Sequence, residues 1–159
     1  MINIIVDTRE QAPWDFTFFG FTNISQKLKA GDYSIQGLEH KVLIERKATS
    51  GELAINLGKK SKQFKKELEI MSKVEHKYIL CEFPMDDMLI FPVNSGIPTK
   101  LWPKLRMTSN YLTYIVNELA STYGIKIIYS NSKTEANEKA ADILRSVYEE
   151  QRRDSKAPW

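Results

Sequence analysis

The sequence predicts an α/β domain in which a mixed central β-sheet carries helices on both faces. Short apolar runs typical of buried strands fill the first 47 residues, and segments with helical periodicity follow and alternate with further apolar runs. The chain has 159 residues, of which 42% are hydrophobic and 27% charged, so it is long and apolar enough for one core. We expect a single domain over residues 1–151 and a flexible C-terminal tail over 152–159.

The strands are predicted from apolar runs that end at turn residues. Residues 2–6 are almost entirely branched aliphatic, and 41–47 has three such residues at its centre. Gly31 and Gly37 mark two turns between short runs, so we expect the first strands to pair in sequence order as a β-meander. The predicted strands cover residues 2–6, 24–29, 33–35, 41–47, 77–83 and 125–129.

The helices are predicted from apolar residues at helical spacing. In 61–74 they recur at i, i+4 and i+7, and Gly124 is typical of the position after a helix end. Ser50 and Ser61 suit the N-cap position. The predicted helices cover residues 52–57, 61–74, 108–123 and 133–151, and the proline-containing stretch 84–103 is expected to be an ordered connection with a short helix near 86–89.

Several classes of function are excluded by what the sequence lacks. The single cysteine, Cys81, lies in an apolar run and reads as a buried hydrophobe, and two histidines argue against zinc or histidine-based catalysis. We find no nucleotide-binding motif, no signal peptide and no apolar run near the ~20 residues that span a bilayer. The sequence therefore predicts an intracellular protein, cytoplasmic or nucleoid-associated, with no membrane contact and no nucleotide cofactor.

Positive charge is concentrated rather than large. The net charge is +3, but residues 59–66 contain five lysines and no acidic residue. Such a cluster is either a solvated helix face or a contact surface for phosphates, and its place soon after Glu45 and Lys47, the candidate catalytic residues considered next, favours DNA. The predicted DNA-binding residues are Lys59, Lys60, Lys62, Lys65 and Lys66.

Three acidic residues stand at the ends of predicted strands: Asp7, Asp32 and Glu45. A carboxylate at such a place needs compensation, and a hard divalent cation bound through oxygen ligands provides it. Glu45 and Lys47 share one face of their strand, which predicts a phosphodiesterase site where the cation activates a water. An ordinary exposed strand pair remains the alternative, and the role of Lys47 toward the water or the phosphate stays open.

Several ordered motifs resemble those of XPF/Hef-type nucleases, which carry the ERCC4 domain and belong to the PD-(D/E)XK superfamily. The resemblance is closest to stand-alone, phage-like members, through Pro-Trp-Asp-Phe at 13–16. Gly-Asp at 31–32 and Glu-Arg-Lys at 45–47 are similar to the GD…ERK signature, the stretch 6–11 to a V-D-x-R-E opening, and 64–68 to an F-x-x-E-L helix.

This resemblance implies a restriction-endonuclease-like fold and a DNA endonuclease that uses Mg²⁺ or Mn²⁺ and cuts near branched or flap junctions, as in DNA repair or recombination. It also implies self-association into a homodimer. Asp32 and Glu45 would ligate the metal with Asp7 as a third acid, and Lys47 would be the catalytic lysine. The supporting polar residues of the site would be Arg9, Glu10 and Arg46.

The chain departs from the family pattern at the last acidic position. The pattern E-R-K-x-x-x-D places Gly51 where the acid belongs, and Glu52 follows one residue later. Glu52 is either the stand-in for that acid or an ordinary acid at a helix N-terminus, where the helix dipole favours it.

A second departure is that no segment resembles the helix-hairpin-helix domain that many relatives use to bind DNA. DNA affinity must then come from the nuclease domain itself or from a partner. A non-catalytic module for branched DNA on the same fold is the alternative function. The presence of the complete GD and ERK residues favours the enzyme, and the V-D-x-R-E opening argues against a restriction-like nuclease of another family.

Overall fold

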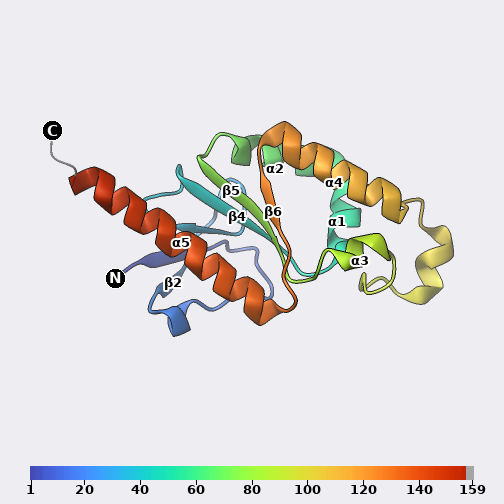
Figure 1. Ribbon diagram of the computed structural model, residues 1–159, viewed down its shortest axis with the longest axis horizontal. Helices are drawn as coiled ribbons and strands as arrows, with labels where there is room; N and C mark the ends of the chain where they lie inside the picture. Colours follow the sequence, from blue (N-terminus) through green and yellow to red (C-terminus); the bar gives the residue numbers. More distant parts are fainter. Residues whose placement is uncertain (157–159) are drawn as a thin grey trace.

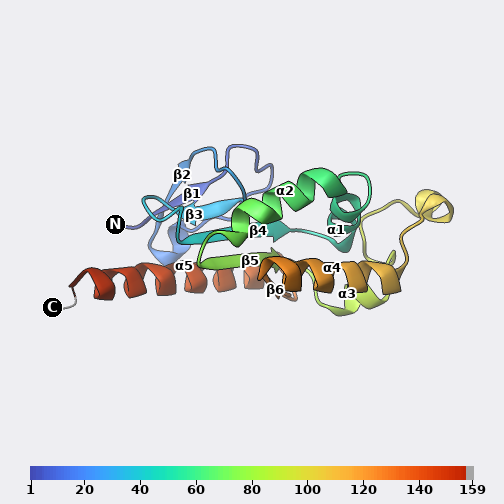
Figure 2. The same ribbon diagram turned by 90° about the horizontal axis from the view of Figure 1, so that it is seen from above.

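The computed structural model describes residues 1–156 and contains one six-stranded mixed sheet. The strands are arranged in the order β2-β1-β3-β4-β5-β6. Figures 1 and 2 show α1 and α2 on one side of the sheet and α5 on the other, which confirms the predicted α/β class. The strands are β1 (Asn3–Val6), β2 (Thr22–Ser25), β3 (Tyr33–Ile35), β4 (Val42–Lys47), β5 (His76–Cys81) and β6 (Lys126–Ile128). The helices are α1 (Ser50–Leu57), α2 (Ser61–Ser72), α3 (Asp86–Leu89), α4 (Ser109–Tyr123) and α5 (Lys133–Lys156), with 3₁₀ turns η1 (Thr17–Phe19) and η2 (Thr99–Lys104).

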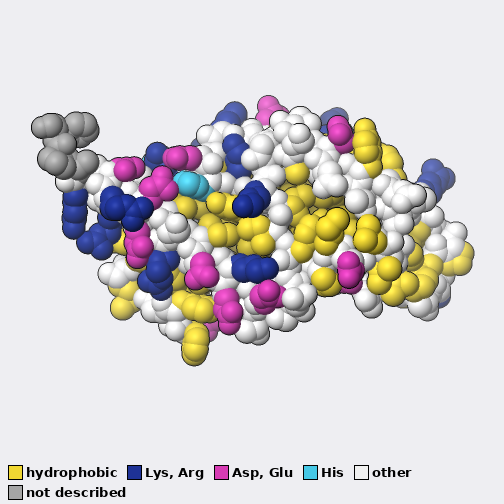
Figure 3. All heavy atoms as spheres, in the orientation of Figure 1, with side chains coloured by type: hydrophobic (Ala, Val, Ile, Leu, Met, Phe, Trp, Pro, Cys, Tyr) yellow, Lys and Arg dark blue, Asp and Glu magenta, His cyan; other side chains and the backbone are white. Residues whose placement is uncertain are grey.

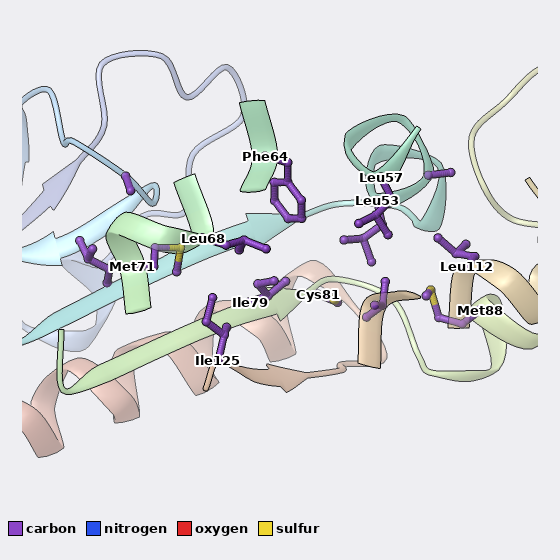
Figure 4. Packing of buried hydrophobic residues seen from close by; sticks show 14 of the residues in the cluster. Leu53, Leu57, Phe64, Leu68, Met71, Ile79, Cys81, Met88, Leu112 and Ile125 are labelled. Atoms are coloured by element: carbon purple, nitrogen blue, oxygen red, sulfur yellow. The ribbon is translucent and has the colours of Figure 1, made fainter. Parts of the chain in front are cut away.

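The sheet separates two cores because successive side chains of a strand point to opposite faces. On β4, Leu43 packs under α1, α2 and α4, whereas Ile44 packs under α5. Figure 4 shows the first core, where Phe64 and Leu68 from α2 lie over Ile79 of β5. The second core is closed by the apolar stripe of α5, made of Ala136, Ala140, Ala141, Leu144 and Val147.

The predicted β-meander is wrong. β1 lies between β2 and β3; it pairs in parallel with β2, starting from Asn3 opposite Thr22, and antiparallel with β3. The connection over residues 7–21 is long enough to return the chain to the start of β1, which a parallel pair requires and a tight hairpin does not. β2 accordingly ends at Ser25, and the predicted strand over 24–29 is wrong beyond that residue.

Three helix boundaries also differ from the predictions. Thr49, not Ser50, caps α1, because its hydroxyl accepts a hydrogen bond from the Glu52 amide (3.3 Å). Ser61 is the first residue of α2 and does not cap it. α5 continues to Lys156, so the loose tail expected from residue 152 is wrong up to that point; basic residues in its last turn suit the helix dipole. Residues 157–159 lie outside the described residues.

Other expectations are confirmed. Gly124 ends α4 in the left-handed conformation at φ +67°, and the proline-containing stretch carries α3 and η2 in an ordered arm at one end of the molecule (Figure 1). Cys81 is buried, and burial raises the pKa of its thiol to about 12, as suits an inert core residue.

The surface of the α5 side divides into two regions. Figure 3 shows charged side chains gathered over the C-terminal half of α5 and hydrophobic side chains gathered over α3, α4 and the arm. Within residues 1–156, no helix has the length and apolar character needed to cross a membrane.

Candidate active site

The β4 strand places Glu45 and Lys47 side by side on the sheet face covered by α2. Lys47 Nζ lies 2.9 Å from Glu45 Oε2 and 5.4 Å from the centre of the Phe64 ring of α2. Both side chains are buried, and their neighbour on the same strand face, Leu43, belongs to the core under α2. The alternative of an exposed strand pair is therefore wrong, because the pair lies beneath a helix.

The Gly31-Asp32 turn brings a second carboxylate to the same place. Asp32 N–H donates to the Ile44 carbonyl (2.8 Å), and Asp32 Oδ2 accepts from the Arg46 amide (2.7 Å). Gly31 has φ +77°, and a Cβ there would approach the Ile44 carbonyl oxygen to 3.3 Å. Glycine is thus required both by the backbone conformation and by the close approach of β4. The turn and the strand together fix the Asp32 carboxylate beside Glu45.

A third carboxylate, Glu67 of α2, completes the group and was not among the predicted site residues. Its Oε1 accepts a hydrogen bond from the Gly31 amide (3.1 Å). The sequence carried a signal for it, because Glu67 lies three residues after Phe64 and four before Met71, within the stripe that faces the core. An acidic residue inside an apolar stripe indicates a buried polar site below the helix.

The three carboxylates share one ammonium, and the electrostatics reflect that imbalance. Burial and the charge of Glu45 raise the pKa of Asp32 well above its usual range. Burial and Glu45 also raise the pKa of Glu67 to about 7. Burial alone would lower the pKa of Lys47, but the adjacent Glu45 carboxylate outweighs it and the pKa is raised, so the ammonium stays charged.

One oxygen of this group lacks any partner. Glu45 Oε1 is buried and accepts no hydrogen bond from residues 1–156. A buried carboxylate oxygen without a donor is costly, and a divalent cation compensates it. The donor set, all carboxylate oxygen, suits Mg²⁺ or Mn²⁺ and lacks the nitrogen and sulfur ligands that favour zinc. The residues present therefore fit the predicted cofactor.

Asp7 lies next to the group through its backbone but directs its carboxylate elsewhere. Asp7 N–H donates to the Asp32 carbonyl (2.8 Å). Its Oδ2 accepts from Arg9 Nε (2.8 Å), and its Oδ1 accepts from the Leu28 amide (2.8 Å). Burial acts to raise the pKa of Asp7, but the hydrogen bonds from Arg9 and Leu28 outweigh it and the pKa is lowered. Both oxygens of the predicted third ligand are thus already engaged.

Arg46, Glu10 and three further residues form a network on the opposite face of the sheet. Arg46 Nε lies 2.7 Å from Glu10 Oε2, and Nη1 lies 3.3 Å from Glu82 Oε1. The Tyr33 hydroxyl donates to Glu10 Oε2 (2.5 Å), and Trp14 Nε1 donates to Glu82 Oε2 (2.7 Å). Arg46 thus anchors β4 from the α5 side while its backbone amide holds Asp32 on the other side.

Glu52 occupies the N-terminal turn of α1, as one of its two interpretations expected. Its Oε2 accepts from the Ala48 amide (3.0 Å), and its own amide is bonded to Thr49. At Gly51, the position of the family's last acid, a Cβ would overlap the carbonyl oxygen of Ser95. The departure from the family pattern has a packing cause, because the loop after α3 fills that space.

The five predicted DNA-binding lysines are all exposed. Lys59 and Lys60 lie in the connection from α1 to α2, and the other three lie on α2, where Lys66 directly precedes Glu67. None of the five forms an ion pair with the residues that the structure describes. A separate group with carboxylates, Glu75 and Glu150 around His76, lies at the start of β5 and is not part of this site.

Comparisons with known proteins identify the family and the fold of the chain. The family model described as the ERCC4 domain matches residues 6–143. The structure of XPF from Aeropyrum pernix has a TM-score of 0.66 and 20% identity, over 91% of this chain and 60% of that one. The structure of XPF from Aeropyrum pernix in complex with DNA has a TM-score of 0.62 and 19% identity, over 99% and 68%. No curated protein sequence matches significantly. At these identities the structural likeness establishes the fold, and the chain spans less than two thirds of the first structure's length.

Proposed function

Since the chain belongs to the ERCC4 domain family, we propose that it is a divalent-metal-dependent DNA endonuclease. The observation that carries this proposal is that Asp32, Glu45 and Glu67 lie within electrostatic reach of Lys47, which contacts Glu45 directly, while one buried Glu45 oxygen has no partner among the described residues. The XPF structure in complex with DNA supports DNA as the substrate. The resemblance in the sequence motifs supports branched or flap DNA, cut near a junction, and thereby a role in DNA repair or recombination.

Asp32, Glu45 and Glu67 would hold the cation, Mg²⁺ or Mn²⁺. When bound, such a cation supplies a Lewis acid that activates water and offsets phosphate charge. We assign the third ligand to Glu67 rather than to Asp7, because the Asp7 oxygens already accept hydrogen bonds from Arg9 and Leu28. The Arg46 and Gly31 amides orient the Asp32 and Glu67 carboxylates.

Lys47 acts in this proposal as a fixed positive charge. Its ammonium is buried beside Glu45, and its raised pKa keeps it protonated, which favours stabilisation of charge on the phosphate over proton abstraction from water. Arg46 and Glu10 act through the position of β4, since their side chains meet on the opposite face of the sheet. Glu52 acts through the start of α1.

The test is cleavage of labelled flap, splayed-arm and plain duplex DNA with Mg²⁺ or Mn²⁺. We expect junction-selective cutting that EDTA stops and that Asp32→Asn, Lys47→Met and Glu67→Gln each abolish. Glu69→Gln, an exposed acid on the same helix, is the matched control and is expected to cut normally. Salt-sensitive binding of branched DNA without cutting by the wild type would instead support the non-catalytic module.

We also propose self-association through the apolar surface over α3, η2 and α4. Exposed large hydrophobic side chains gather there and, with the hydrophobic region in Figure 3, support an interface with a second copy. Light scattering of wild type should give a dimer, and Tyr111→Ser with Tyr114→Ser a monomer, whereas Phe18→Ser, elsewhere on the surface, should leave the dimer intact. The exposed residues are Met85, Leu89, Ile90, Val93, Leu101, Tyr111 and Tyr114.

A further inference from the structure

The connection between β2 and β3 presents two exposed lysines just before the Gly31-Asp32 turn of the site. Burial alternates along it, with Lys27 and Lys29 exposed and Leu28 and Ala30 buried in the core under α2. Alternation of this kind directs the two lysine side chains outward on the same side of the segment. The segment then runs through Gly31, whose amide contacts Glu67, into the candidate site.

The segment is held in place by Asp7 and Arg9. Leu28 N–H donates to Asp7 Oδ1 (2.8 Å), and the Leu28 carbonyl accepts from Arg9 Nη2 (3.1 Å). The Arg9 guanidinium is itself fixed by Asp7 through Nε (2.8 Å). Asp7 thus connects Arg9 with the Leu28 segment that carries Lys27 and Lys29.

Within the part of the chain that the structure describes, the two lysines have no contact that would explain them structurally. Lys27 and Lys29 form no ion pair or side-chain hydrogen bond with any of residues 1–156. The Arg9 side chain remains 59% exposed despite its pair with Asp7. Its pKa is raised first by the Asp7 hydrogen bond and also by the negative charges of Glu67 and Asp32, so it lies within electrostatic reach of the site.

A site with a surplus of carboxylates repels a polyanion, so cations at its border are needed to bring a phosphate backbone close. The lysines over 59–66 form one such border. We propose that Arg9, Lys27 and Lys29 form a second one, which contacts DNA phosphates next to the scissile bond, and that Asp7 is its positioning residue rather than a metal ligand. The proposal rests on the proposed function in that the polyanion is the DNA substrate.

The first test measures DNA binding without cleavage. The protein carries Asp32→Asn, and its Kd for a labelled splayed-arm oligonucleotide is measured by fluorescence anisotropy at several salt concentrations. Adding Lys27→Ala with Lys29→Ala should lower the slope of log Kd against log salt by roughly 1.5–2. The same double substitution should weaken binding at low salt roughly tenfold or more. Arg152→Ala with Arg153→Ala, the same charge change on α5 at the other sheet face, is the control. Equal slopes for the two double variants would overturn the proposal.

The second test separates positioning from metal ligation by Asp7. Asp7→Asn should keep Mn²⁺ affinity within about threefold of wild type, measured by calorimetry, and should lose the same salt slope as the lysine variant. Adding Asp7→Asn to the lysine variant should then change the slope little. Lost Mn²⁺ binding with an unchanged slope would make Asp7 a ligand and refute the proposal.

A further variant and the choice of binding as the readout make both tests interpretable. If Asp7→Asn fails to fold, Arg9→Gln removes the clamp and leaves Asp7 in place, and it should lower the salt slope in the same way. Because both tests measure binding, they are independent of cleavage. If the wild type never cuts DNA but its salt slope depends on the two lysines, the proposed nuclease activity is refuted and the proposed phosphate contacts stand. If the wild type cuts DNA and the lysine variant has an unchanged salt slope, the phosphate contacts are refuted and the nuclease activity stands.

Discussion

Glu67→Gln offers the sharpest test of the carboxylate group, because this substitution inside the site is expected to stabilise the metal-free protein. In the metal-free protein, burial and Glu45 raise the pKa of Glu67 from 4.5 to about 7. The carboxyl is therefore harder to ionise in the folded state, and stability is lost as the pH rises from the unfolded pKa through the folded one. Glutamine keeps the acceptor for the Gly31 amide and removes the charge.

The magnitude follows from the shift. A change in pKa from 4.5 to about 7 corresponds to about 3 kcal/mol at pH 8 and about 1 kcal/mol at pH 5. Glu67→Gln should recover most of this in EDTA, which raises the melting temperature by roughly 6–12 °C at pH 8 for a domain of this size. With saturating Mn²⁺ the wild type should instead be the more stable of the two proteins, since it has the Glu67 carboxylate as a metal ligand and the variant does not.

Thermal unfolding followed by circular dichroism, in EDTA at pH 5 and pH 8, checks this directly. Glu69→Gln, exposed on the same helix, should show no such dependence on pH. If Glu67→Gln were no more stable than wild type at pH 8, or gained equally at both pH values, Glu67 would not share a buried site with Glu45.

Three further predictions concern the same region. Mn²⁺ at ten times its Kd should stabilise the wild type by about 1.4 kcal/mol in thermal unfolding, and Asp32→Asn should lose this gain; equal gains would exclude Asp32 as a ligand. Gly31→Ala should cost about 1–3 kcal/mol in urea unfolding, through its positive φ and the nearby carbonyl, and more than Gly37→Ala, which has positive φ but open space around it. Arg46→Met should cost about 3–5 kcal/mol, because two buried carboxylates lose their partner, and changing both to glutamine should restore much of the loss.

The sequence predicted those parts of the site that depend on local geometry. Strand alternation placed Glu45 and Lys47 on one face, and a glycine-containing turn before a strand placed Asp32 at its edge. Glu67 was missed because its contribution depends on how α2 crosses the sheet, which the helical period alone does not give. The engagement of Asp7 was missed for a similar reason, since its partner Leu28 lies 21 residues away.

The order of the strands in the sheet was not predicted, because it depends on the connection between β1 and β2 and not on the strands themselves. The burial pattern of β1 is compatible with two sheet orders. β1 can lie at the edge and pair with β2 alone, as in a meander, or lie between β2 and β3, as the structure has it. The choice is made by the 7–21 loop, whose aromatic residues Trp14, Phe16 and Phe21 are buried in the core under α5 and carry the chain back beside Asn3. These three aromatic residues are therefore part of the core.

The two faces of β4 give an internal comparison that bears on function. On the α5 face, Glu10 and Glu82 are buried but compensated by Arg46, Tyr33 and Trp14, so the network is complete without any ligand. On the α2 face, the buried Glu45 and the half-buried Asp32 and Glu67 have one ammonium, and the group has raised carboxyl pKa values and an oxygen without a donor among residues 1–156. The same strand, at similar depth, is thus satisfied on one side and deficient in positive charge on the other. Because the fold compensates buried acids around Arg46, the deficit of positive charge on the α2 side supports the proposal that a cation binds there.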